Sequence, residues 1–220
     1  MNPDTLTPIA IVLVVTLSVA GFVLWQRQTR EDQKKRWSIF ALLCISAIFI
    51  VVLTLLEREF GANSIFFACV VAFVPLGWMA FVNEVVELSV PERLRTLRPW
   101  ELSGIQYRAL GVPVFGAILR GSVLRHLSPR VYLGTIPTEP TVVCRHLAVV
   151  EAIHVWATVL TLPYLVFACL RGWWLPVVFI MAINLVANLY PIMHLRWAHG
   201  RMERLIKAIT LKEARTRKAR

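Results

Sequence analysis

Charged residues are scarce in this 220-residue chain, and acidic residues are the scarcest of them: 13 Asp and Glu stand against 24 Lys and Arg. Only 17% of the residues are charged, whereas 57% are hydrophobic, and the mean hydropathy is +0.64. A soluble domain of this length is rarely so apolar. The composition therefore excludes an ordinary soluble protein and indicates a polytopic membrane protein.

Cysteines are few, and the common catalytic fingerprints are missing. The four cysteines show no C-x-x-C spacing, which argues against a disulfide framework or a zinc site. The chain has no G-x-S-x-G, Walker A or dinucleotide-binding motif, and no H-x4-D of the acyltransferase type. His146 lies near Glu151 and His154, but no further ligand is spaced to complete a metal site, so we predict no bound metal.

Long apolar runs are what the chain has instead. Five of them are long enough, at 1.5 Å per residue, to cross a hydrocarbon layer of roughly 30 Å with some tilt. They are residues 8–25, 38–56, 64–82, 146–169 and 175–195. The sequence thus predicts an all-α membrane protein with about five transmembrane helices. The first run has its basic residues after it, which is typical of an uncleaved anchor with its N-terminus outside.

The basic residues are concentrated in every second segment between the predicted spans. Segments 26–37, 83–145 and 196–220 contain 22 of the 24 Lys and Arg, and the other two loops contain only Arg58 and Arg171. By the positive-inside rule, the N-terminus lies outside and the C-terminus lies in the cytoplasm. The formal net charge of +11 then favours contact with anionic lipid headgroups over nucleic acid.

These patterns divide the chain into four regions. A three-span membrane region is followed by a cytoplasmic segment of amphipathic helices on the inner leaflet, a two-span hairpin and a basic amphipathic tail. Their bounds are 1–82, 83–145, 146–200 and 201–220.

The two-span hairpin contains polar residues inside apolar runs. Glu151 and His154 lie one turn apart on the first span, and Asn184, Asn188 and Pro191 lie on the returning span. Ionisable groups inside membrane helices are costly and usually mark a functional site. Because the two spans are antiparallel and joined by a short turn, we expect Glu151, His154, Asn188 and Pro191 at one depth.

Glu151 and His154 suit general-base chemistry. A carboxylate beside an imidazole raises its basicity and fixes its tautomer, so we predict His154 as the base and Glu151 as the residue that orients it. The same pair also suits a purely structural link between two helices, and the sequence does not separate these interpretations.

The remaining candidates are substrate contacts. Asn184 and Asn188 can hold a carbonyl or a sugar hydroxyl, although interhelical hydrogen bonds are the more common role of a single asparagine in such a helix. Arg196 and Arg201 can bind a phosphate or carboxylate, or they are positive-inside anchors.

Three stretches of this hairpin resemble a known family. They are residues 150–156 (VEAIHVW), 188–193 (NLYPIM) and 196–202 (RWAHGRM). Glu and His three residues apart, an Asn–Pro on the next span and a closing Arg-Tyr-Asn-Arg-x-Arg motif are typical of the glycosyl-4,4'-diaponeurosporenoate acyltransferases. The resemblance covers about the last 120 residues by the spacing of the hairpin. The closing motif departs from the family, because Trp197, Ala198 and His199 replace Tyr, Asn and Arg.

The resemblance implies an integral enzyme of the bacterial cell membrane. Such an enzyme esterifies a sugar hydroxyl of a glycosylated carotenoid, or a similar glycolipid, with a fatty acyl group at the inner leaflet. It implies an acyl thioester as the co-substrate and no bound cofactor. The thioester carrier would then be the ligand of Arg196 and Arg201.

Two other function classes remain open. The chain is also compatible with a non-catalytic accessory subunit of a membrane complex, in which the polar cluster is an assembly site. A different small membrane enzyme, of the methyltransferase or reductase type, acting on an isoprenoid lipid is the other alternative. A transporter is disfavoured because the five runs show no repeat that would give two alternating halves. The sequence contains no signal for the oligomeric state.

Overall fold

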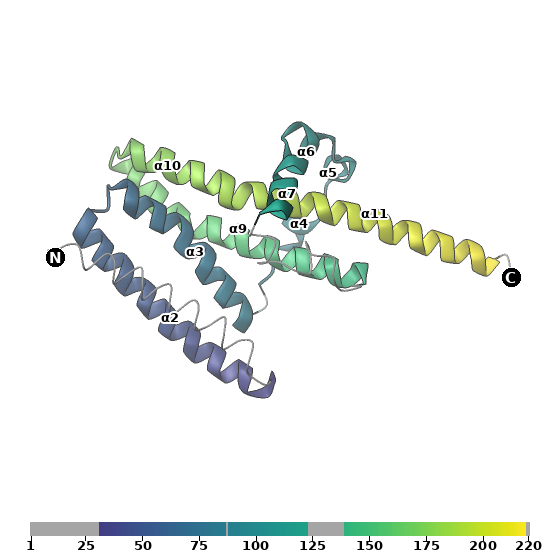
Figure 1. Ribbon diagram of the computed structural model, residues 1–220, viewed down its shortest axis with the longest axis horizontal. Coiled ribbons are helices and arrows are strands. Elements are labelled where there is room, and N and C mark those ends of the chain that lie inside the picture. Colours follow the sequence, from purple (N-terminus) through teal and green to yellow (C-terminus); the bar gives the residue numbers. More distant parts are fainter. Residues whose placement is uncertain (1–30, 87, 123–138, 219–220) are drawn as a thin grey trace. The chain divides into compact units, whose positions relative to one another are not determined.

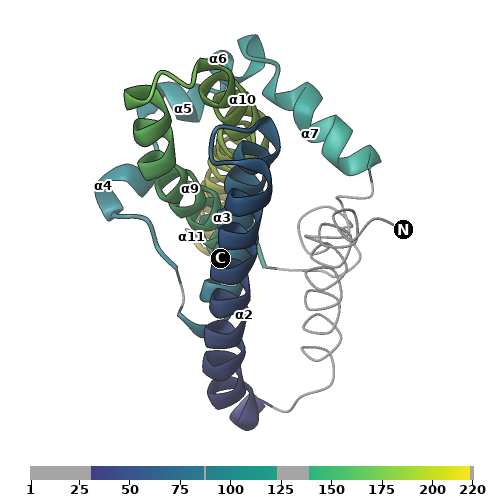
Figure 2. The ribbon, with the colours of Figure 1, turned by 90° about the vertical axis from the view of Figure 1, so that its left-hand side faces the viewer.

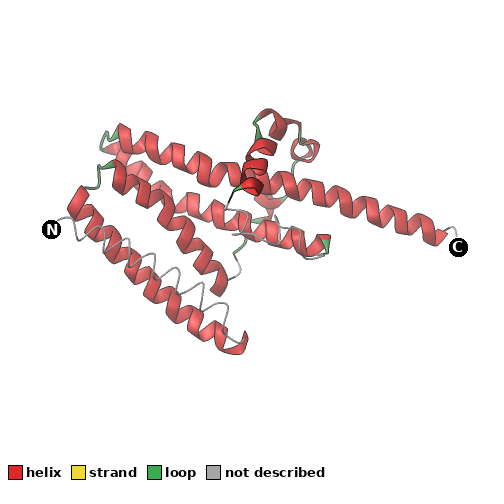
Figure 3. Cartoon of the chain, viewed as in Figure 1, coloured by secondary structure: helices red, strands yellow, loops and turns green. Residues whose placement is uncertain are grey.

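The computed structural model describes residues 31–86, 88–122 and 139–218 (Figure 1). Within these ranges every regular element is a helix (Figure 3), which confirms the predicted all-α class. The described elements are α2 (Glu31–Phe60), α3 (Ile65–Val85), α4 (Glu92–Arg95), α5 (Pro99–Ser103), α6 (Ile105–Ala109), α7 (Val112–Gly121), α9 (Pro140–Leu170), α10 (Trp174–Asn184), η2 (Leu185–Leu189) and α11 (Tyr190–Lys218).

Four stretches of the described helices are long and apolar enough to cross a membrane, judged by length and composition. They are Phe40–Phe60, Ile65–Asn83, Pro140–Leu170 and Trp174–Arg217. They overlap almost completely with four of the five predicted runs, and the remaining run, 8–25, lies outside the described residues. The helices extend beyond the predicted limits. α9 begins at Pro140, well before residue 146, because proline is well tolerated at the start of a helix.

The chain divides into two compact units, which we describe separately. Unit 1 comprises the chain up to Glu87 together with Ala157–Ile183, and unit 2 comprises Leu88–Trp156 and Asn184–Arg220. Helix α9 therefore contributes residues to both units.

Unit 1 contains the antiparallel hairpin of α2 and α3, which pack along each other (Figure 2). Gly61 adopts a φ of +75° at the turn, a conformation that suits glycine. Ser64 then caps α3, because its side chain accepts a hydrogen bond from the Phe67 amide at 3.1 Å. The interface is apolar, with one cluster of Ile45, Phe49 and Phe81 and another of Val52, Leu56 and Phe67.

The indole N–H of Trp78 and the phenol hydroxyl of Tyr164 both donate hydrogen bonds within unit 1. Trp78 Nε1 donates to Ser46 Oγ at 2.7 Å and so links α3 to α2. Tyr164 on α9 donates to the carbonyl of Ala62 at 2.8 Å, while its ring packs on Phe67. The second half of α9 is thus tied to the α2–α3 turn by one hydrogen bond and one ring contact.

The turn between α9 and α10 follows the sequence-based expectation of a short loop at Arg171 and Gly172. Gly172 has a φ of +71°, and the amide of Trp173 donates to the carbonyl of Ala168 at 2.9 Å. Such a glycine-dependent bond satisfies a carbonyl at the helix C-terminus. The chain therefore reverses within a few residues.

Unit 2 is built on α11, against which α5, α6 and α7 pack. Gly116 of α7 lies directly on the ring of His194, since a Cβ atom added to this glycine would come within 2.8 Å of Nδ1. Tyr190 donates to the carbonyl of Leu110 at 3.1 Å and stacks near Phe115. The opposite side of α7 is apolar and exposed, as Val114 and Ile118 are 64% and 63% accessible.

The predicted basic tail at 201–220 is not separated from the last span by a break. Helix α11 runs continuously from Tyr190 to Lys218. Its apolar residues, among them Leu205 and Ile209, are spaced as the amphipathic pattern predicted, and both are exposed. No proline and no glycine after Gly200 interrupts the segment, so the helix has no cause to stop earlier.

Candidate active site

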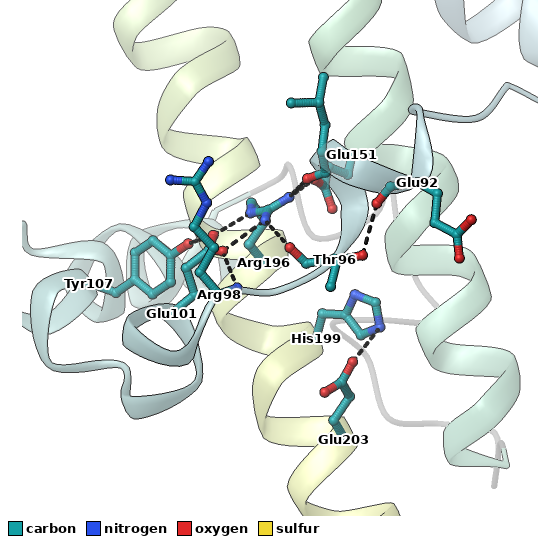
Figure 4. Close-up of polar contacts among 10 residues, drawn as sticks. Glu92, Thr96, Arg98, Glu101, Tyr107, Glu151, Arg196, His199 and Glu203 are labelled. Atoms are coloured by element: carbon teal, nitrogen blue, oxygen red, sulfur yellow. Dashed lines mark hydrogen bonds and ion pairs between the residues drawn. The ribbon is translucent and has the colours of Figure 1, made fainter.

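Arg196 on α11 lies between two buried carboxylates from distant parts of the chain (Figure 4). Its Nε donates to Oε1 of Glu101 at 2.6 Å and its Nη2 donates to Oε2 at 2.9 Å, so the guanidinium holds both oxygens of this carboxylate. Its Nη1 donates to Oε1 of Glu151 at 2.7 Å. Glu101 and Glu151 are only 4% and 2% exposed. One cation therefore joins α5, α9 and α11 in unit 2.

The same guanidinium also bonds two backbone carbonyls in and after α4. Nη1 donates to Leu94 at 2.8 Å, and Nη2 approaches the oxygen of Thr96 at 3.5 Å. A guanidinium has five N–H groups, and these five contacts match that number. A further anion must therefore displace an existing acceptor before Arg196 can bind it.

Glu101 is positioned by its own short helix. α5 begins at Pro99 with Arg98 as the preceding residue, and Glu101 Oε2 accepts the backbone N–H of Arg98 at 2.7 Å, as in a capping box. Its Oε1 accepts the hydroxyl of Tyr107 on α6 at 2.7 Å. With the two bonds from Arg196, both oxygens of this carboxylate have two donors each.

These contacts decide the charge of Glu101. Burial alone would raise its pKa, but the hydrogen bonds from Arg196, the Arg98 amide and Tyr107 lower the pKa to about 2. Burial, together with the neighbouring Glu101 carboxylate, raises the pKa of Tyr107 well above its usual value. Near neutral pH the pair is therefore a carboxylate accepting a hydrogen bond from an intact phenol.

A second polar cluster lies about one turn from Glu151 along α9. His154 Nδ1 is 3.2 Å from Oδ1 of Asn188 in η2, and Asn188 Nδ2 donates to Oδ1 of Asn184 at 2.7 Å. Asn188 is fully buried, with an exposed fraction of 0%. Three side chains thus form one hydrogen-bonded row across two antiparallel segments.

The backbone of η2 explains how Asn188 comes to face His154. Leu185–Leu189 is a turn of π-helix, a widened turn that is often found at functional sites. Pro191 follows it and has no N–H to offer the carbonyl of Ala187, four residues earlier. His154 forms a hydrogen bond with the backbone of Ala187. The irregular turn therefore presents both a side chain and a backbone group to the same imidazole.

The structure brings together some of the residues that the sequence singled out and gives others new partners. His154 and Asn188 are in contact, as their predicted common depth requires. Glu151, whose predicted role is to orient His154, accepts a hydrogen bond from Arg196. Arg201 is exposed, and its guanidinium lies 5.1 Å from the ring centre of Trp197 in a cation–π arrangement.

Sequence reasoning missed Glu101 and Tyr107. Both lie in short helices of a segment that was interpreted only as a membrane-surface region. The local signal for Glu101 was present, since Arg98, Pro99 and Glu101 form a helix start with an acidic residue at the third position. Nothing local connects this carboxylate to Arg196, which follows 95 residues later.

Within the described residues, no group of three or more His, Cys, Asp or Glu side chains is arranged to hold a metal ion. The described site offers an imidazole, two carboxylates, amides and a guanidinium.

Comparison with known proteins places both clusters in one matched region. The family model described as glycosyl-4,4'-diaponeurosporenoate acyltransferase matches residues 91–208, which is just over half of the chain. This range begins at α4 and includes Glu101, Glu151, His154, Asn188 and Arg196. Searches of curated proteins and of solved structures gave no match.

Proposed function

The chain belongs to the glycosyl-4,4'-diaponeurosporenoate acyltransferase family, and we propose that it transfers a fatty acyl group from a thioester to a sugar hydroxyl of a glycosylated carotenoid. The family match carries this proposal, because it covers the whole polar site together with the short helices that surround it. The apolar helices indicate a membrane protein, which agrees with an acceptor that is itself a membrane lipid.

His154 is the proposed general base. Its imidazole removes the proton of the acceptor hydroxyl while the hydroxyl oxygen attacks the thioester carbonyl carbon. The C–S bond then breaks, and the departing thiolate takes the proton back from the imidazolium. The products are the acylated sugar and a free thiol. The step needs no oxidant or reductant, since its atoms and electrons balance with these two substrates alone.

The cluster around Arg196 has a separate role in this proposal. Glu101, Glu151 and Arg196 hold α5, α9 and α11 together beside the base, and Arg196 has no N–H group left over for a substrate. We therefore assign the binding of an anionic acyl carrier to Arg201, whose guanidinium is exposed. Arg196 is a positioning residue in this assignment.

We place the reaction at the inner leaflet of a bacterial cell membrane. The positive-inside distribution of Lys and Arg supports a cytoplasmic C-terminus, close to cytosolic acyl thioesters. The exposed apolar side chains of α6 and α7, among them Ile105, Val114 and Ile118, alternate with Arg108 and Arg120. An apolar surface flanked by arginines suits the boundary between acyl chains and anionic headgroups.

The test is acyl transfer by membranes that contain the chain or its variants. Membranes are supplied with a glycosylated carotenoid and a radiolabelled fatty acyl-CoA, and the ester is separated by chromatography. His154→Ala should lower kcat by roughly 10²–10⁴-fold, the usual contribution of a general base. Val159→Ala, an exposed position farther along α9, is the matched control and should keep wild-type activity.

Two results would contradict the proposal. If wild-type membranes formed no ester from any glycosylated carotenoid, the reaction itself would be wrong. If His154→Ala turned over like the control, the reaction would stand and the base would have to be another group. Gel filtration of the purified variants in detergent separates loss of folding from loss of chemistry.

A further inference from the structure

We propose that the end of α11 is a docking surface for a small acidic protein that carries the fatty acyl group as a thioester. The surface is one exposed side of the helix, formed by Arg204, Lys207, Leu211 and Arg215, which we call the α11 stripe. The proposal rests on the proposed function, because it names the class of molecule that delivers the acyl group. It goes beyond the assignment of Arg201 by placing the contact surface of the carrier protein itself.

The helical period places the four residues of the α11 stripe on one side. Leu211 follows Lys207 by four residues and Arg204 by seven. Arg215 follows Leu211 by another four, and positions at these spacings share a face of an α-helix. All four side chains are exposed, and Leu211 is 61% accessible, so an apolar side chain lies among three basic ones. An apolar centre with a polar rim is typical of a protein interface.

The charge of this part of α11 favours an acidic partner. Residues 201–217 contain six Lys or Arg and only two Glu. Complementary charge speeds the encounter of two proteins and selects between partners. A second copy of this chain would bring like charges together on the same stripe, which opposes self-association.

The distribution of apolar residues and the continuity of α11 argue against a lipid surface as the occupant. A helix that lies on a membrane has its apolar residues on one face and its basic residues on the other. The exposed Ile209 and Leu211 are two residues apart, so they lie on nearly opposite sides of the helix. In the proposed topology α11 leaves the membrane and continues unbroken to Lys218 (Figure 1). No proline or glycine follows Gly200 to kink this end back onto the bilayer.

The α11 stripe lies on the same helix as the candidate site. Leu211 follows Arg196 by 15 residues, which is about 22 Å along the axis at 1.5 Å per residue. The exposed guanidinium of Arg201 lies between them in the sequence. Arg204 donates a hydrogen bond to the carbonyl of Leu102 and so ties the beginning of the stripe to α5. A carrier that holds its thioester on a flexible arm can therefore dock on the stripe and reach past Arg201.

Two matched pairs of variants test the surface by binding alone. The full chain, purified in detergent, is titrated with a fluorescently labelled acyl carrier protein that bears a fatty acyl group, and Kd is measured by anisotropy. Arg215→Glu should weaken binding roughly 10-fold, whereas Arg217→Glu, exposed on nearly the opposite side, should change Kd less than about twofold. Leu211→Ala should weaken binding about 5–10-fold, and Ile209→Ala is its control on the other side.

Turnover with two acyl donors separates the carrier protein from coenzyme A. With the acyl carrier protein as donor, Arg215→Glu should raise KM about 10-fold and leave kcat unchanged, because the contact is remote from the reacting atoms. With the same acyl group on coenzyme A, Arg215→Glu and Arg217→Glu should both keep the wild-type KM. The KM for the carrier protein should also rise with ionic strength, since salt screens exposed charges.

Three results would overturn the proposal. Equal losses of binding in Arg215→Glu and Arg217→Glu would show an effect of net charge and not of a surface. Equal KM values for the two donors, unchanged in the variants, would make coenzyme A the carrier. Nanodiscs of anionic lipid that abolish carrier binding and protect Arg215 from trypsin would assign the stripe to a lipid surface. An absence of ester with both donors would instead refute the proposed function, and the binding titration would still decide the docking surface.

Discussion

Replacing Arg196 by methionine removes the cation that is hydrogen-bonded to both Glu101 and Glu151, and it should destabilise the protein severely. The lowering of the Glu101 pKa from 4.5 to about 2 corresponds to about 3 kcal/mol of folding free energy. Breaking a buried ion pair by removing one partner typically costs 3–5 kcal/mol. We therefore expect Arg196→Met to lose about 3–5 kcal/mol.

The assay is SDS-induced unfolding of the purified protein in mild detergent, followed by tryptophan fluorescence. Arg215→Ala is the matched control, because this arginine is exposed on the same helix, and its effect should stay within about 0.5 kcal/mol. Glu101→Gln removes the charge from the opposite side of the pair and should also be strongly destabilising, since it leaves Arg196 with one carboxylate fewer.

The pH dependence gives a sharper test of the same reasoning. The folded-state pKa of Glu101 is depressed, so its stabilisation is fully present above about pH 4.5 and is lost as the pH falls towards about 2. The stability gap between wild type and Arg196→Met should therefore be widest near neutral pH and narrow in acid. A gap below about 1 kcal/mol, as for an exposed ion pair, or a gap independent of pH would refute the reasoning.

Three further predictions concern packing, the acidic cluster and topology. Gly116→Ala should lower the free energy of unfolding by roughly 1–3 kcal/mol, because the new methyl group meets the ring of His194. Gly121→Ala, with open space around it, is the control and should not destabilise the protein. Equal unfolding midpoints for the two variants would contradict the contact. Tyr107→Phe removes a donor to a buried carboxylate, so acid unfolding should begin at higher pH with a loss of about 1–2 kcal/mol, and an unchanged acid midpoint would exclude the bond. Reporter fusions should be active in the cytoplasm after residue 220 and outside the membrane at Gly172, and the reverse pattern would invert the proposed topology.

The features that the sequence predicted are those that depend on local pattern and length. Apolar runs predicted the helices, and the short turn at Gly172 predicted an antiparallel pair. Counting the helical rise from His146 and from Leu195, the ends of the two spans away from the turn, was enough to expect His154 and Asn188 at one depth, and the structure has them in contact. A rise of 1.5 Å per residue is a property of every helix, so it needs no knowledge of side-chain packing.

The features that were missed depend on contacts between distant segments. Glu151 and His154 share a helix face, but a carboxylate beside a guanidinium gains more than one beside a neutral imidazole, so Glu151 pairs with Arg196. Glu101 joins them from a helix of only five residues, which has no periodic pattern to reveal its face. The π-turn before Pro191 also shifts the register in a way that a regular helix does not predict.

The link between Glu151 and Arg196 has a consequence for biogenesis. The two residues are 45 positions apart, so at 5–20 residues per second the ribosome adds the arginine roughly 2–9 seconds after the glutamate. During this interval α9 must be accommodated with an acidic side chain that has no counter-ion from the unfinished helix. A nascent chain halted before Arg196 would expose that imbalance to the quality-control machinery of the membrane, and synthesis of the last helix would complete the neutralisation.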